Sequence, residues 1–276
     1  MKTTREFVLE HNGSNLHYWL SVSENAPLVV LTHGACLNHQ MFEAQIEPLV
    51  SAGYATLTWD MRGHGKSKPL GSNFTVGIAA DDLLAILNDT GYETACFVGH
   101  SFGGFVTQEF AFRYPERVSA MGVIGCTDMT AKPSQIIAIA SKPMPFLLRL
   151  MSLESFRKQT VEHVSIREDV TQYAYEATGN LNKEEYIKVI LAGLECLTVD
   201  AGYGDNYTIP VPFLLTHGEK DSANNGIFPK SAPDWAAKEV HCTYKAIPDA
   251  GHCANQDNPD TFNTILLDFL KEHIPV

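Results

Sequence analysis

Residues 95–104 read Ala95-Cys96-Phe97-Val98-Gly99-His100-Ser101-Phe102-Gly103-Gly104. The apolar start of this stretch predicts a buried strand and the residues from Phe102 onward predict a helix, so strand, sharp turn and helix meet at Ser101. Such a turn needs glycines on both sides, because the serine backbone is strained and bulky neighbours would clash where strand and helix approach. This is the pattern of a nucleophile elbow, which presents a serine Oγ to a base.

The composition limits the classes of protein that this chain can be. It has 276 residues, of which 45% are hydrophobic, so it can bury one substantial core, and we expect no second independent domain. The formal net charge of −12 and the lack of any lysine- and arginine-rich run disfavour nucleic acid as a partner. The N-terminal residues lack the apolar core of a secretion signal, and no apolar run approaches membrane-spanning length. We therefore expect a cytoplasmic protein with no membrane partner.

The six cysteines are predicted to be free thiols, because they show no Cys-x-x-Cys spacing and the chain shows no export signal. Two of them, Cys36 and Cys253, adjoin motif residues described below. Neither has an elbow around it, so both rank below Ser101 as candidate nucleophiles.

Apolar runs predict a largely parallel sheet. Residues 6–11 and 15–22, separated by Asn12-Gly13-Ser14, predict an antiparallel hairpin at the start of the chain. Continuous apolar runs then predict six strands buried on both faces, as parallel strands usually are. These runs cover residues 27–32, 54–59, 95–98, 120–126, 211–216 and 243–247.

Helical patterns between these runs complete an α/β architecture with helices on both faces of the sheet. They cover residues 40–52, 75–88, 102–113 and 261–273. The alternation stops at residues 129–207, where helical patterns at 145–161 and 183–197 have no strong strand between them. We predict that residues 129–207 are a helical insertion and that residues 1–128 and 208–276 form the core domain.

A serine hydroxyl becomes a strong nucleophile only when a neighbouring base takes its proton. His252 is the candidate base, because Asp249-Ala250-Gly251-His252 directly follows the last strand run, where a loop at the sheet edge could reach Ser101. The other histidines have less suitable positions. We expect structural roles for His33, His64 and His100 beside glycine turns, and solvated rings for His11, His17, His163 and His273.

The base needs a carboxylate that holds its tautomer, and this acid should follow a strand between the serine and the histidine. Asp221, in His217-Gly218-Glu219-Lys220-Asp221 after the run 211–216, fits best because its loop is long enough to reach the histidine ring. Asp128 after the preceding strand and Glu219 remain alternatives.

Acyl transfer also needs hydrogen-bond donors for the oxyanion that forms on the attacked carbonyl, and backbone N–H groups are already oriented for this. The elbow offers the N–H of Phe102. The turn after the first buried strand, His33-Gly34-Ala35-Cys36, offers the N–H of Ala35.

Together these residues resemble the α/β-hydrolase family over nearly the whole chain. The resemblance rests on five ordered motifs: His33-Gly34, residues 60–67 (Asp-Met-Arg-Gly-His-Gly-Lys-Ser), residues 99–104, residues 217–221 and Ala250-Gly251-His252. It implies a mostly parallel eight-stranded sheet, a helical cap, and a catalytic triad of Ser101, Asp221 and His252, with a structural role for the 60–67 turn. The serine excludes the branches with an aspartate nucleophile, which is the arrangement of epoxide hydrolases and haloalkane dehalogenases.

We therefore predict a serine hydrolase that cleaves a small, largely apolar carboxylic ester or lactone, with no metal or organic cofactor. Two alternatives remain, because a fold does not determine its substrate. One is hydrolysis of a carbon–carbon bond in a β-diketone or dienoate, and the other is a small-molecule receptor with vestigial hydrolysis.

Apolar cap residues are expected to line the pocket or to pack the cap on the sheet: Met129, Met144, Phe146, Leu147, Leu150, Met151 and Phe156. A basic bias in the cap predicts a solvated face or, alternatively, a site for a substrate carboxylate; it comes from Lys132, Lys142, Arg149, Arg157 and Lys158.

Overall fold

The computed structural model describes residues 4–21, 26–131, 139, 142–204 and 207–276. Its eight strands form one sheet in the order β1-β2-β4-β3-β5-β6-β7-β8. The first two strands form the predicted antiparallel hairpin, β2 pairs antiparallel with β4, and all later pairs are parallel. The strands are β1 (Thr4–His11), β2 (Ser14–Ser21), β3 (Leu28–Thr32), β4 (Ala55–Trp59), β5 (Ala95–His100), β6 (Val118–Ile124), β7 (Phe213–Gly218) and β8 (Cys242–Ile247).

Helices cover both faces of this sheet. On one face, α2 (Val76–Thr90), α3 (Phe102–Arg113) and α9 (Ile227–Lys238) share a buried cluster with the strands. On the other face, α1 (Glu43–Ser51), α10 (Ala254–Asp257) and α11 (Pro259–His273) share a second cluster. Since parallel strands are buried on both faces by their crossover helices, this arrangement explains the continuous apolar runs of the sequence.

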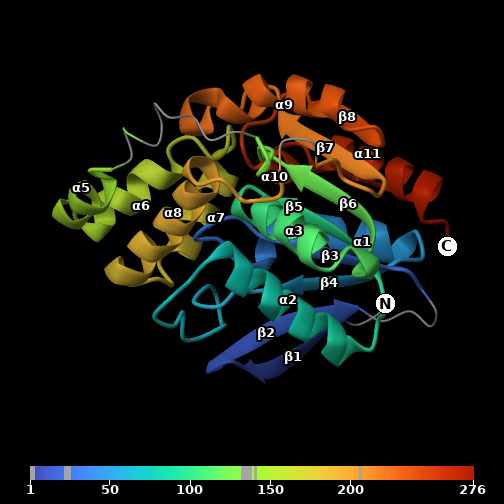
Figure 1. Cartoon of the computed structure of the whole chain (residues 1–276), viewed down its shortest axis with the longest axis horizontal. Coiled ribbons are helices and arrows are strands. Elements are labelled where there is room, and N and C mark those ends of the chain that lie inside the picture. The colour runs from blue at the N-terminus through green and yellow to red at the C-terminus, as the bar shows by residue number, and fades with distance from the viewer. Residues whose placement is uncertain (1–3, 22–25, 132–138, 140–141, 205–206) are drawn as a thin grey trace.

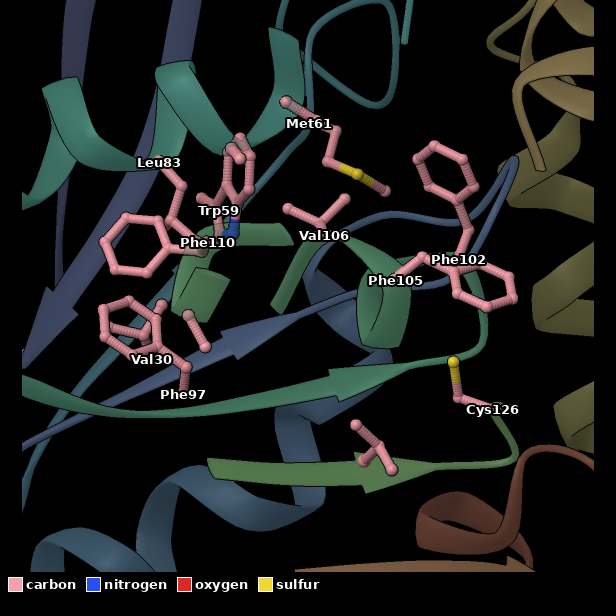
Figure 2. Packing of buried hydrophobic residues seen from close by; sticks show 14 of the residues in the cluster. Val30, Trp59, Met61, Leu83, Phe97, Phe102, Phe105, Val106, Phe110 and Cys126 are labelled. Atoms are coloured by element: carbon pink, nitrogen blue, oxygen red, sulfur yellow. The ribbon is translucent and has the colours of Figure 1, made fainter. Parts of the chain in front are cut away.

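The first cluster packs the helix that follows Ser101 firmly against the sheet (Figure 2). Phe97 of β5 lies with its ring centroid 4.4 Å from that of Phe110, about two turns along α3. Val30, Trp59 and Phe97 are fully buried. Burial of aromatic side chains of this size contributes about 1.5–3 kcal/mol each, so the elbow is built on a rigid support.

Between β6 and β7, the described residues form four helices that lie together at one end of the molecule (Figure 1). They are α5 (Met144–Leu150), α6 (Leu153–Val161), α7 (Glu168–Thr178) and α8 (Lys183–Thr198), and we call them the cap. After these helices the chain returns to the sheet at β7. In the part of the chain that the structure describes, no helix has the length and apolarity needed to cross a bilayer.

Several element predictions need correction. The run 243–247 was expected to be buried on both faces, but β8 is an edge strand and most of its residues are partly exposed. The pattern 145–161 predicted one helix, whereas the structure has α5 and α6, because the Ser152 side chain caps a new helix by accepting a hydrogen bond from Ser155 N–H. Helices α7 and α9 were not predicted.

Candidate active site

The predicted strain at Ser101 is present. Its backbone has φ 50° and ψ −116°, and it stands between the end of β5 and the first residue of α3. A Cβ on Gly99 would lie 2.1 Å from the Gly103 carbonyl oxygen, and one on Gly103 would lie 2.3 Å from the Thr32 carbonyl oxygen. Both contacts involve backbone that cannot move aside, so these positions require glycine.

His252 and Asp221 form a buried pair. His252 Nδ1 lies 2.8 Å from Asp221 Oδ2, and each residue is 5% exposed. A carboxylate can only accept, so Nδ1 carries the proton and Nε2 is left free to act as an acceptor. The other carboxylate oxygen of Asp221 accepts from the Ala223 N–H at 2.9 Å, which fixes the acid, and Phe228 stacks on the imidazole with ring centroids 4.8 Å apart.

The two alternative acids have other surroundings. Asp128 forms an ion pair with Lys238, with Oδ2 and Nζ 2.9 Å apart, and its Oδ1 accepts from the Thr130 N–H and hydroxyl. Glu219 is exposed at the end of β7. Within the described residues neither carboxylate contacts His252, so the structure brings Asp221 to the histidine and leaves the other two apart.

Ser101 and His252 line one cavity of about 530 Å³ beneath the cap. No hydrogen bond joins Ser101 Oγ to His252 in the described part of the chain. Contacts between a nucleophile and its base are often long in an empty site and shorten when substrate binds. The shared cavity places the hydroxyl, the imidazole and the space for a substrate together.

The two predicted oxyanion donors also lie at this cavity or beside it. Ala35 lines the cavity, and Phe102 follows Ser101 as the first residue of α3, where a helical N–H has no partner within the helix. Across the described residues, no protein acceptor takes a hydrogen bond from either N–H. A Cβ on Gly34 would lie 2.6 Å from His100 Nδ1, so glycine is needed for the loop to approach the elbow.

Buried neutral histidines support this loop, as the sequence suggested. His33 Nδ1 donates to the Gly34 carbonyl at 2.8 Å, and its Nε2 accepts from the Met61 N–H at 3.0 Å. His100 Nε2 donates to the His252 carbonyl at 3.0 Å. Burial lowers the pKa of His33 to about 4 and that of His64 to about 3, and it lowers the pKa of His100 well below its usual value. All three rings are therefore uncharged at neutral pH.

These lowered pKa values predict an acid-sensitive fold. Unfolded histidine titrates near 6.5, so below that pH the unfolded chain binds more protons than the folded chain and the free energy of unfolding falls. Between pH 7 and pH 5 we expect a loss of about 2 kcal/mol for His33 and for His64. Urea denaturation at both pH values should show a smaller loss in His64→Asn, which keeps a donor toward the Arg62 carbonyl. Equal losses in wild type and variant would contradict this assignment.

The turn at residues 60–67 has the structural role that the resemblance implied. The buried Asp60 carboxylate accepts from the His39 N–H and the Lys66 N–H, both at 2.8 Å. A Cβ on Gly65 would lie 2.1 Å from Asp60 Oδ2, so glycine is required for this turn. The turn thus holds the loop that follows Ala35 and Cys36 in place.

Only some of the apolar cap residues that the sequence indicated line the cavity. Met144 and Phe156 line it, joined by Leu148, which the sequence analysis did not single out. Met129 and Met151 pack on the buried cluster. The prediction was wrong for Phe146, Leu147 and Leu150, which are 64%, 48% and 69% exposed and belong neither to the cavity nor to the core.

Polar cap residues at the cavity were missed by the sequence analysis. Gln159, Thr160, Glu162 and His163 come from the end of α6 and the loop after it. His163 was expected to be a solvated ring; it is exposed, but it lies at the cavity. Surface helices usually carry polar residues for solubility alone, so the sequence held no signal that this helix end faces a site.

Two of the basic cap residues, Arg157 and Lys158, bind partners outside the cavity. Arg157 donates from Nε to the Thr178 hydroxyl at 3.0 Å and lies over the Tyr175 ring, and Lys158 pairs with Glu154 on the exposed face of α6. Lys132 lies outside the described residues. As far as the chain is described, no lysine or arginine lines the cavity.

The two cysteines near the motifs are poor nucleophiles. Cys36 and Cys253 are both buried, and burial raises the pKa of each thiol above its usual value. Thiol reactivity requires the thiolate, so these groups stay inert at neutral pH. All six cysteines are free, as predicted.

Comparison with known proteins agrees with this architecture. A family model described as the alpha/beta hydrolase family matches residues 29–265. The chain belongs to the alpha/beta hydrolase family. The predicted resemblance, the predicted fold and the expectation of an enzyme are thereby confirmed.

Curated members of the family include hydrolases of several kinds. Epoxide hydrolase 3 from Xenopus tropicalis is 27% identical over 293 residues, which cover 96% of this chain and 77% of that protein. The 2-hydroxy-6-oxononadienedioate/2-hydroxy-6-oxononatrienedioate hydrolase from Klebsiella pneumoniae is 26% identical over 285 residues, covering 97% of this chain and 96% of the relative. The enol-lactonase from Burkholderia xenovorans LB400 superposes with a TM-score of 0.80 at 21% identity, over 96% of this chain and 99% of that one. This last likeness shows the shared fold.

Proposed function

We propose that the protein is a serine hydrolase of small, uncharged carboxylic esters or lactones. The observation that carries this proposal is the cavity that Ser101 shares with His252, whose Nδ1 lies 2.8 Å from Asp221. His252 Nε2 takes the Ser101 proton while Oγ attacks the acyl carbon, and the N–H groups of Ala35 and Phe102 stabilise the oxyanion. The leaving alcohol takes the proton back, and water activated by His252 then cleaves the acyl-enzyme.

A serine nucleophile favours acyl transfer over epoxide hydrolysis, the reaction for which the Xenopus relative is named. Attack of a serine hydroxyl on an acyl carbon forms an ester, which water can cleave to release the enzyme. Attack of the same hydroxyl on an epoxide would form an ether, which has no carbonyl for water to attack. Ser101 therefore supports an ester or lactone as substrate and disfavours an epoxide.

The charge of the cavity supports an uncharged substrate. A lysine or arginine is the strongest partner for a buried carboxylate, because a charge-assisted hydrogen bond replaces its hydration better than a neutral donor does. The described lining contains no lysine or arginine, and Glu162 adds an exposed acidic group to it. The Klebsiella relative is named for a dioate, which carries two carboxylates. The lining of this cavity therefore favours neutral esters and lactones over such a compound.

A substrate panel tests the proposal. The panel combines nitrophenyl esters of increasing acyl length, simple lactones, and one ester of matched length that ends in a carboxylate. We expect turnover that is absent in Ser101→Ala and a kcat/KM at least about tenfold lower for the carboxylate-bearing ester. Rapid cleavage of a dienoate dicarboxylate without ester turnover would overturn the proposal in favour of carbon–carbon hydrolysis. Near-stoichiometric reaction with retained ligand would overturn it in favour of a receptor.

A further inference from the structure

The loop that carries His252 is hydrogen-bonded to the cap. Cys253, the residue after the histidine, donates its N–H to the Val164 carbonyl at 2.6 Å. Val164 belongs to the loop between α6 and α7 and lines the cavity. The cap loop therefore contacts the histidine loop on the cavity side, through backbone groups that the amino-acid sequence does not reveal.

Asp257 makes a second connection between the same two loops. Its Oδ2 accepts from the Gly251 N–H at 2.7 Å and from the Ile166 N–H at 3.2 Å, and its Oδ1 accepts from the Ser165 hydroxyl. The residue is 8% exposed at the end of α10. One carboxylate thus binds the residue before His252 and two residues of the cap loop.

The contact leaves little freedom to either loop. A Cβ on Gly251 would lie 3.1 Å from Asp257 Oδ2 and 3.3 Å from Ile166 N, so the two loops are closely packed at this point. Asp257 holds the Gly251 N–H, and the peptide group between His252 and Cys253 is held at both ends, its carbonyl by His100 and its N–H by Val164. Three successive residues are fixed, and two of the three bonds involve the cap loop or the acid that binds it.

We propose that Asp257 is a positioning residue that orients His252 by fastening its loop to residues 164–166 of the cap. The cap loop and the His252 ring therefore take up their positions together. The inference rests on the proposed role of His252 as the base. A misplacement of about 1 Å can cost about a hundredfold in rate, so loss of the connection should act on the chemical step.

Two substitutions at one position separate positioning from charge. Asp257→Ala removes every acceptor, and we expect kcat to fall by at least about tenfold with KM nearly unchanged. Asp257→Asn keeps an oxygen for the Gly251 and Ile166 N–H groups, and its amide can donate to the Ser165 hydroxyl, so kcat should stay within about threefold of wild type. The rate of Ser101 labelling by a fluorophosphonate should follow kcat in both variants.

Ser165→Ala tests the cap side alone, because it leaves the Gly251 contact in place. We expect kcat and the labelling rate to fall together by about two- to fivefold, without a matching rise in KM. If Asp257→Ala does not fold, an unchanged labelling rate in Ser165→Ala overturns the proposal. It is also overturned by a folded Asp257→Ala with wild-type rates, or by Asp257→Asn as impaired as Asp257→Ala. Failure of the proposed function is distinct, since wild type would then turn over no ester or lactone, whereas the labelling rates of Ser101 would still compare the variants.

Discussion

Replacing Ser101 with alanine is expected to lower kcat for the best ester of the panel by at least about ten-thousandfold. The substitution removes the atom that bonds to the acyl carbon, and the oxyanion donors alone leave only weak residual catalysis. The Ala35 and Phe102 N–H groups and the cavity remain, so KM should change little. Steady-state kinetics on the purified variant gives both parameters.

Ser51→Ala is the matched control, because Ser51 is an exposed serine at the end of α1. It should keep wild-type kinetics. Ester turnover in Ser101→Ala within about tenfold of wild type would contradict the assigned nucleophile.

Asp221→Asn is expected to lower kcat by about a thousandfold to ten-thousandfold, while Asp128→Asn should stay within about threefold of wild type. An amide at 221 can donate to His252 Nδ1, which favours the tautomer that has its proton on Nε2 and cannot accept the Ser101 proton. Asp128 is engaged with Lys238 and Thr130, so its amide variant loses an ion pair and leaves the histidine as it was.

The comparison is made on kcat at a pH above the range in which free imidazole is protonated. The reverse ranking, with Asp128→Asn inactive and Asp221→Asn active, would show that the acid of the triad is Asp128, which follows β6. Similar losses in both variants with a lowered melting temperature in each would also count against a specific role for Asp221.

The core of the fold could be predicted from the sequence because its signals are local. Buried parallel strands appear as continuous apolar runs, and the Ser101 elbow needs glycines at fixed positions around it. Local signals fail where tertiary contacts determine which secondary structure forms. Helix α9 contains Pro233 in its interior, which argues against a helix, yet its Trp235 is buried in the core.

The site could be predicted in part for the same reason. His252 and Asp221 follow recognisable strand ends, so their approach was foreseeable from topology. The contribution of the cap was not. Leu148 and His163 line the cavity and Leu150 does not, because the placement of the cap helices on the sheet depends on packing rather than on helical spacing. Asp257 acts through two loops 85 or more residues apart in sequence, which no local pattern connects.

A covalent acyl group on Ser101 would identify this serine as the nucleophile directly. The enzyme is mixed with excess nitrophenyl ester, quenched in acid during the first turnovers, digested, and examined by mass spectrometry. We expect an acyl adduct on the peptide that contains Ser101, with the mass of the acyl chain supplied, and no adduct in Ser101→Ala. Ester turnover with no adduct on Ser101, or with the acyl group on another residue, would contradict this expectation.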